Sequence, residues 1–163
     1  MKNLELSNIR CDEGKISETF IKQIEKKYNI SLPVSYSSFI IEHNGACLFA
    51  RIFDYQDPNI GVYKRNSSSI AFESVEDILF HIENIKAGEE PDWDDMYKFE
   101  DGLIPFGDNG GGDMICFDYR KDRSTDNPPI VIWNHDMGLE HRVVFIANNF
   151  EEFINMLHKC EDE

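Results

Sequence analysis

The fold is indicated most clearly by residues 32–45, which have the sequence LPVSYSSFIIEHNG. Pro33 suits the start of a helix, because that position needs no N–H donor and proline already has a helical φ. Tyr36 and Phe39 then lie three residues apart, the spacing of one helix face. Asn44–Gly45 follows, a pair that tolerates the left-handed backbone in which helices commonly end. The stretch therefore predicts a helix with one apolar face.

Three further segments have the apolar spacing of amphipathic helices. They are expected to begin after Ser17, Ser74 and Asn149, because the side-chain oxygens of these residues can accept a hydrogen bond from a free backbone N–H of the first turn. Asp77 and Glu152 follow Ser74 and Asn149 by three residues, which is the spacing of a capping box. The sequence thus predicts four helices.

Five segments alternate in polarity or are rich in β-branched and aromatic residues, as strands are. They are residues 47–53, 68–73, 113–120, 130–134 and 140–146. With the helices, they predict an α+β fold in which about four helices pack against a single mixed, largely antiparallel sheet of about six strands. Without a repeat or a long linker, residues 1–163 are expected to form one domain.

The segment around Trp133 contains two histidines that could serve as metal ligands. A turn at residues 137–138 would set three facing pairs: Trp133 with Arg142, Asn134 with His141, and His135 with Glu140. In this register His135 and His141 point to opposite faces of the sheet and cannot share a metal ion. We therefore expect no metal site here, and a cation–π contact between Trp133 and Arg142 instead.

Residues 107–113, GDNGGGD, contain three consecutive glycines that could present backbone N–H groups to an anion. A phosphate-binding loop, however, opens into a helix, whereas this segment opens into a predicted strand. Asp108 and Asp113 would also repel phosphate. Calcium loops carry acidic ligands more densely and end on a glutamate. We interpret the segment as a tight connection between strands, with glycine providing unusual backbone angles.

The four cysteines lie far apart and form no C-x-x-C motif; they are Cys11, Cys47, Cys116 and Cys160. Their pattern predicts reduced thiols that serve mostly as small core residues. None has the sequence signature of a nucleophile beside a base. The sequence therefore predicts no catalytic residue, no cofactor and no enzymatic activity.

The composition is acidic: 31 Asp and Glu against 16 Lys and Arg give a formal net charge of −15. Such a surface repels phosphate, which disfavours nucleic acid and anionic membranes as partners. It favours a basic protein partner, although solubility alone explains many acidic proteins. The N-terminus has no apolar signal segment and no stretch is long enough to span a membrane, so we expect a cytoplasmic protein.

The negative charge is densest in residues 89–101, which contain seven acidic side chains and one basic side chain. An aromatic residue within a charged rim is typical of an interface hot spot. The alternative is an ordinary solvated loop whose tryptophan folds back onto the core, and the sequence leaves both open. The candidate partner-binding residues are Glu89, Glu90, Asp92, Trp93, Asp94, Asp95, Glu100 and Asp101.

Four blocks of sequence, in order from about residue 17 to 158, resemble the SUKH superfamily, also called the Smi/Knr type. The first block matches LPxxYxxFLxxxNG, and the others contain IPFG with GGGDxIxFD, VxWxH, and ANNFxxFI. The motif residues concerned are Leu32, Pro33, Tyr36, Phe39, Asn44, Gly45, Pro105, Gly107, Gly111, Gly112, Asp113, Trp133, Phe150 and Phe153. Their chemistry indicates structural roles, and no catalytic residue comes with them.

The resemblance implies an α+β fold and a role in protein–protein interaction. Bacterial members resemble immunity proteins that neutralise a cognate toxin, and fungal members resemble multi-partner regulators of cell-wall glucan synthesis. The sequence departs from the pattern at Ala46, where a second glycine is common, and residues 54–72 and 86–101 match no part of it. We expect a bacterial immunity protein that binds a basic toxin. Nucleases are one class of toxin that would fit this expectation. The alternative is a regulatory scaffold, and the oligomeric state stays open.

Overall fold

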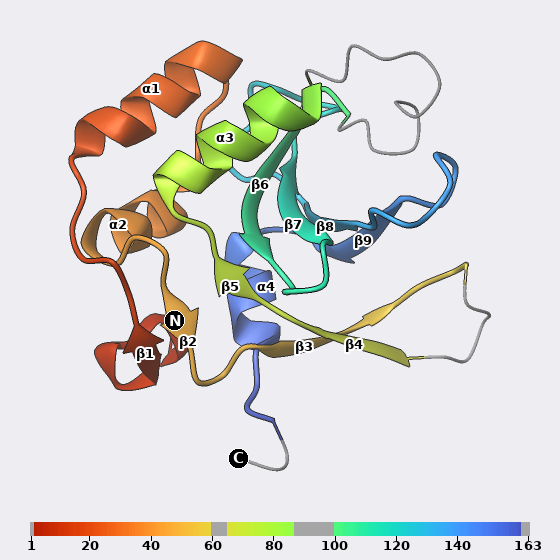
Figure 1. Ribbon diagram of the computed structural model, residues 1–163, viewed down its shortest axis with the longest axis horizontal. Helices are drawn as coiled ribbons and strands as arrows, with labels where there is room; N and C mark the ends of the chain where they lie inside the picture. The colour runs from red at the N-terminus through yellow and green to blue at the C-terminus, as the bar shows by residue number, and fades with distance from the viewer. Residues whose placement is uncertain (1, 60–64, 87–99, 161–163) are drawn as a thin grey trace.

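A computed structural model describes residues 2–59, 65–86 and 100–160 (Figure 1). The helices in these ranges are α1 (Glu18–Tyr28), α2 (Val34–Glu42), α3 (Val75–Lys86) and α4 (Phe150–Met156), with 3-10 turns at Lys2–Leu4 and Leu6–Asn8. The strands are β1 (Ile9–Cys11), β2 (Cys47–Leu48), β3 (Ile52–Gln56), β4 (Arg65–Ser69), β5 (Ala71–Phe72), β6 (Leu103–Asp108), β7 (Met114–Asp118), β8 (Ile130–Trp133) and β9 (Val143–Ala147). In this described part of the chain, no helix combines the length and apolar character needed to cross a membrane.

The predicted helix starts are confirmed by their capping hydrogen bonds. Side-chain oxygens accept from backbone N–H groups at three sites: Ser17 from Thr19, Ser74 from Asp77, and Asn149 from Glu152. Each bond satisfies one donor that the first helical turn leaves without a partner. These local signals are therefore sufficient to place α1, α3 and α4.

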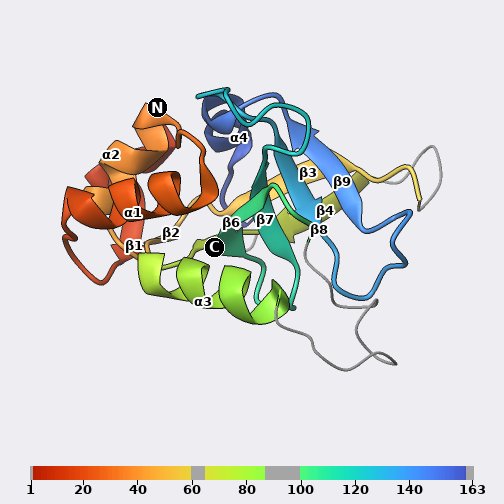
Figure 2. The same ribbon diagram turned by 90° about the horizontal axis from the view of Figure 1, so that it is seen from above.

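The α+β class is confirmed, but the strands do not form one mixed sheet. Strands β5 to β9 form a five-stranded sheet in chain order, and every ladder within it is antiparallel. Two separate antiparallel ladders, β1–β2 and β3–β4, lie beside it (Figures 1 and 2). The predicted single six-stranded sheet is thus wrong in its connectivity, while the balance of helix and strand is right.

The buried side chain of Asn8 explains why the predicted strand at residues 47–53 is interrupted. The backbone N–H of Phe49 donates to the backbone carbonyl of Asn8 at 2.8 Å. The backbone N–H of Ala50 donates to the side-chain oxygen Oδ1 of Asn8 at 2.9 Å. These two amides are therefore lost to any regular ladder between β2 and β3. The chain turns at this point, so that β2 pairs with β1 and β3 pairs with β4.

The main core lies between the four helices and one face of the five-stranded sheet. Ile115 and Phe117 of β7 point into this core, whereas Met114 and Cys116 belong to a smaller cluster with Leu103, Val131 and Trp133. Because successive residues of a strand face opposite sides, the smaller cluster marks the other face of the sheet. The sheet is therefore apolar on both faces near its middle.

An aromatic cluster at the centre of the main core joins α2, α4 and the sheet. The Phe106 and Phe117 rings stack with centroids 4.3 Å apart, and the Tyr36 ring meets the Phe117 ring edge-on at 5.0 Å. Phe150 meets the Tyr36 ring at 5.5 Å. All four residues are buried. Offset and edge-on pairs of this kind add about 0.5–1.5 kcal/mol each beyond the area they bury.

The predicted register of the β8–β9 hairpin is wrong by one residue. Trp133 faces Val143 and Ile132 faces Val144, after a register shift between Ile130 and Val131. The hairpin loop is centred on Gly138 instead of between residues 137 and 138, so Arg142 lies one residue before the partner of Trp133. Its guanidinium nevertheless lies 5.6 Å from the centre of the Trp133 ring, so the predicted cation–π contact is confirmed.

Candidate interaction surface

Most of the acidic stretch predicted to bind a partner lies outside the described residues. This applies to Glu89, Glu90, Asp92, Trp93, Asp94 and Asp95. Glu100 and Asp101 are described, and they precede β6 directly. Their contacts show how the end of this stretch is attached to the folded body.

Both of these carboxylates are paired with arginines of the β7–β8 connection. Glu100 Oε2 accepts from Arg120 Nη1 at 2.5 Å, and Asp101 Oδ2 accepts from Arg123 Nη2 at 2.6 Å. Arg120 also holds Asp118 with two bonds of 2.9 Å. Burial opposes ionisation of Asp118, but hydrogen bonds from Arg120 lower its pKa below the ordinary value. Much of the charge of Glu100 and Asp101 is thus already compensated within the chain.

A cleft of about 500 Å³ lies beside this attachment point. It is lined by Lys27, Tyr28, Asn29, Ile82, Glu83, Asp101 and Arg123. Two ion pairs, Lys27 with Glu83 and Arg123 with Asp101, form parts of its walls. Charges of both signs beside the apolar surface of Tyr28 and Ile82 suit a protein partner better than a single anion.

The sequence could not reveal this cleft, because its walls come from four separate segments. The C-terminal end of α1 supplies residues 27–29, and the middle of α3 supplies residues 82–83. Packing of α1 against α3, visible in Figures 1 and 2, brings these segments together. The exposed polar side chains carry no periodic signal that would have marked them.

The glycine segment forms a closed turn between β6 and β7, as expected, and uses its own amides. Asn109 Oδ1 accepts from the N–H groups of Gly111 at 2.8 Å and Asp113 at 3.1 Å, and Asp108 Oδ1 accepts from Gly110 at 2.5 Å. Amides already paired with carboxylate or amide oxygens are poor donors for an anion. The segment is therefore a structural turn and offers no phosphate cradle.

His135 is held by carboxylates rather than placed beside His141. Asp113 Oδ1 accepts from the His135 backbone at 3.1 Å and lies 2.8 Å from its Nδ1, and Asp136 Oδ1 lies 3.0 Å from its Nε2. Among the residues that the structure describes, no three His, Cys, Asp or Glu side chains are arranged to hold a metal ion. The histidine instead ties the β8 end of the hairpin to the glycine turn.

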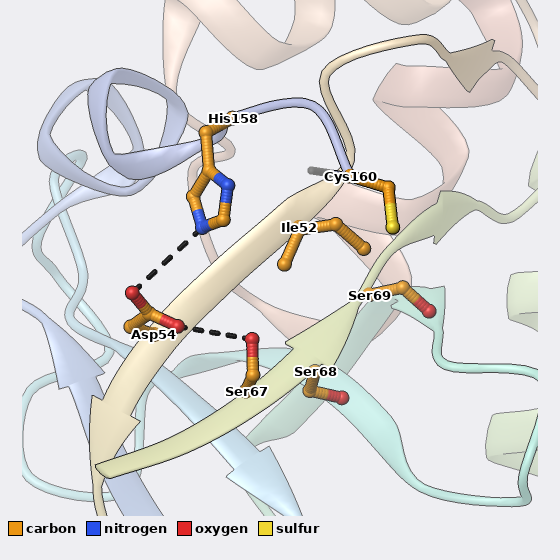
Figure 3. A pocket seen from close by; sticks show the side chains of 7 residues that line it. All are labelled: Ile52, Asp54, Ser67, Ser68, Ser69, His158 and Cys160. Carbon is orange, nitrogen blue, oxygen red and sulfur yellow. Dashed lines mark hydrogen bonds and ion pairs between the residues drawn. The ribbon is translucent and has the colours of Figure 1, made fainter. Parts of the chain in front are cut away.

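A second cleft, of about 560 Å³, lies on the β3–β4 ladder near the C-terminal residues (Figure 3). Asp54 lies between Ser67 and His158: its Oδ1 accepts from Ser67 Oγ at 2.9 Å, and its Oδ2 lies 3.8 Å from His158 Nε2. A hydrolytic triad needs the imidazole between the hydroxyl and the carboxylate. Here the carboxylate is in the middle, so His158 cannot take the proton of Ser67.

Glu73, at the junction of β5 and α3, is a buried carboxyl in acidic surroundings. Burial raises its pKa to about 7, and the nearby charges of Asp108 and Asp77 add to this effect. His81 Nε2 lies 3.3 Å from Glu73 Oε1. The Glu73 side chain is 10% exposed, so it is largely shielded from solvent.

Asn44 of the LPxxYxxF block has a role that the sequence did not indicate. The residue is buried, its Oδ1 accepts from the first N–H of α3 at Val75 at 3.0 Å, and its Nδ2 donates to Glu13 Oε2 at 3.0 Å. Gly45 beside it has φ +60. The side chain of Asn44, which follows α2, therefore helps to fix the start of α3. The first turn of α3 donates hydrogen bonds both to Ser74 next to it and to Asn44, which is distant in the sequence.

The model of the SMI1 / KNR4 family (SUKH-1) matches residues 15–156, which include α1 to α4 and the whole five-stranded sheet. The chain belongs to this family. It is also 27% identical over 157 residues to YobM of Bacillus subtilis (strain 168), an uncharacterized protein, an alignment that covers 89% of this chain and 73% of that protein. Membership in SUKH-1 agrees with the burial of Tyr36, Phe150 and Phe153 in the core.

Proposed function

We propose that this SUKH-1 chain is a bacterial immunity protein that binds a cognate toxin and blocks it, without catalysing a reaction. The observation that carries the proposal is the family match over residues 15–156, because bacterial members of this superfamily resemble immunity proteins. The formal charge of −15 supports it, since an acidic surface attracts a basic partner and repels nucleic acid. A cytoplasmic location is part of the same proposal.

The proposed binding surface is residues 89–101 together with the adjoining cleft at Lys27, Glu83 and Arg123. Two features support this surface: its acidic charge and its position between the motif blocks of the family. Arg120 and Arg123 pair with Glu100 and Asp101. Residues 89–95 contribute five further acidic side chains to the stretch. These residues also match none of the four motif blocks of the family, and loops outside such blocks are where partner specificity is expected.

A basic toxin, such as a nuclease with a phosphate-binding cleft, is the class of partner this charge would suit. Carboxylates of the acidic stretch would occupy positions that nucleic-acid phosphates take in the cleft. The toxin would then be blocked by occlusion, with no bond made or broken.

The proposal is tested by co-expression with a candidate toxin encoded beside the gene for this chain. We expect cells that make the toxin to survive only when this chain is made too. A non-cognate toxin is the matched control, and it should kill in both conditions. Equal killing by the neighbouring toxin with and without this chain would contradict the proposal.

A multi-partner regulatory scaffold is the second candidate, because fungal members of the superfamily resemble such regulators. Affinity purification separates the two functions. An immunity protein should capture one dominant basic partner at one-to-one stoichiometry, whereas a scaffold should capture several unrelated proteins.

A further inference from the structure

Strands β1 and β2 form a short ladder (Figure 1). Its register brings two cysteines, Cys11 and Cys47, face to face. Ile9 pairs with Leu48, and a regular antiparallel register would then place Arg10 opposite Cys47. A register shift in β1 moves Cys11 into that position instead, so that Cys11 and Cys47 are direct cross-strand partners. Facing residues of an antiparallel pair have Cα atoms about 4.5–5.5 Å apart, a separation that a disulfide can span.

The two thiols also differ in accessibility. Both are free, Cys11 is exposed and Cys47 is partly buried. Burial raises the pKa of Cys47, and contact with the Cys11 side chain raises it further. Cys11 is therefore the thiol that an oxidant meets first, and Cys47 is placed to react second. The expectation that the cysteines are mostly core residues is wrong here: among the four, only Cys116 is fully buried.

We propose that Cys11 and Cys47 form a site of reversible disulfide modification, with a small disulfide such as oxidised glutathione as the oxidant. The thiolate of Cys11 attacks one glutathione sulfur, the sulfur–sulfur bond of the oxidant breaks, and one glutathione leaves and takes up a proton. Cys47 then loses its proton and attacks the Cys11 sulfur, which releases the second glutathione. Two protein thiols are oxidised and one oxidised glutathione is reduced to two thiols.

The bond would close a loop from residue 11 to residue 47 that contains both α1 and α2. These helices supply Ile21, Ile24, Tyr36 and Phe39 to the main core. Closing a loop that contains folded core elements restricts the unfolded chain and stabilises the folded one. The modified protein is therefore expected to unfold at a higher temperature than the reduced protein.

The test uses a Cys160→Ser background, which removes the other exposed thiol. The folded protein is incubated with oxidised glutathione and a chelator, and its intact mass, its linked peptides and its melting temperature are measured. We expect a monomer that has lost two hydrogen atoms, with Cys11 linked to Cys47. Its melting temperature should rise by about 5–10 °C and return to the starting value on reduction.

Two variants in the same background separate the steps. Cys47→Ser should stop at a glutathione adduct on Cys11, with no gain in melting temperature. Cys11→Ser should slow the reaction at least about tenfold, because the accessible attacking thiol is gone. The proposal is overturned if the Cys160→Ser protein accumulates the glutathione adduct without forming the Cys11–Cys47 disulfide, or if Cys11→Ser takes up glutathione as fast as the Cys160→Ser protein does.

Discussion

At the scale of single residues, Glu73 carries a carboxyl group that the folded chain resists ionising. Its pKa is about 7 in the fold, against an ordinary value of 4.5, because it is buried beside Asp108 and Asp77. A raised pKa stabilises the fold fully below about pH 4.5, and this stabilisation is lost as the pH rises through about 7. Glu73 thus makes the protein less stable at neutral pH than in mild acid.

Glu73→Gln should remove this pH dependence. Above pH 7 we expect the variant to be about 1–3 kcal/mol more stable than the parent, and near pH 4.5 the two should be equal. His81 also faces this carboxyl, so the profile is measured as melting temperature from pH 4.5 to pH 8.5 in both proteins. Glu76→Gln, an exposed change in the first turn of α3, is the control. If the melting temperatures of the parent and Glu73→Gln change with pH in parallel, the pKa of Glu73 is not raised in the fold and the explanation is contradicted.

Gly112 is required by both its backbone and its surroundings. Its φ is +101, and an added Cβ would lie 3.0 Å from the His135 ring. Gly112→Ala should therefore destabilise the fold by about 1–3 kcal/mol, measured by denaturant unfolding. Gly138→Ala is the matched control, because nothing lies within 4 Å of its added Cβ, and it should change stability by less than about 0.5 kcal/mol. Equal effects of the two changes would contradict this explanation.

At the scale of elements, Asn44 links the end of α2 to the start of α3. Asn44→Ala would leave the buried Val75 N–H without its acceptor, so we expect a loss of about 1–3 kcal/mol in unfolding free energy. Asn155→Ala, an exposed asparagine on α4, should leave stability nearly unchanged or raise it slightly. A loss of less than about 0.5 kcal/mol in Asn44→Ala would show that water replaces the side chain.

The sequence predicts those elements well whose signals are local. The caps at Ser17, Ser74 and Asn149 are confirmed because each depends on residues at most three apart. The split of the sheet was not predictable, because it depends on Asn8 taking two amides from a segment about forty residues away. The β8–β9 register was predicted wrongly because the loop is centred on Gly138, and the pair Met137–Gly138 does not show which residue lies at its tip.

The binding surface at residues 89–101 stays a prediction from charge density. That signal did not indicate the arginines that pair with Glu100 and Asp101, because Arg120 and Arg123 lie about twenty residues further along the chain. The cleft beside them and the Cys11–Cys47 pair likewise depend on contacts between distant segments. The acidic composition therefore supports the proposal of a basic partner, whereas the contacts of individual side chains depend on packing.

At the scale of the whole molecule, the net charge should govern how fast a basic partner arrives. Asp92→Asn, Asp94→Asn and Asp95→Asn together should lower the association rate about tenfold at low salt and leave the melting temperature nearly unchanged. Added salt should reduce the difference in association rate between the parent and the triple variant. Exposed charges are screened over about 8–10 Å at physiological ionic strength. Both effects are measured by stopped-flow binding to the candidate toxin.

The control variant neutralises three exposed acidic residues elsewhere: Glu5→Gln, Asp126→Asn and Glu151→Gln. It changes the net charge by the same amount and should slow association by less than about twofold. If both triple variants slow binding equally, the charge acts through the whole molecule and residues 89–101 have no special role.

Titration of the toxin's activity with this chain tests binding without catalysis most directly. Neutralisation by occlusion predicts that activity falls in proportion to added chain, reaches its minimum at one equivalent, and returns when the complex is separated. Complete loss of activity at a small fraction of one equivalent would instead show turnover by this chain. No loss at a several-fold excess would show that the toxin is not its partner.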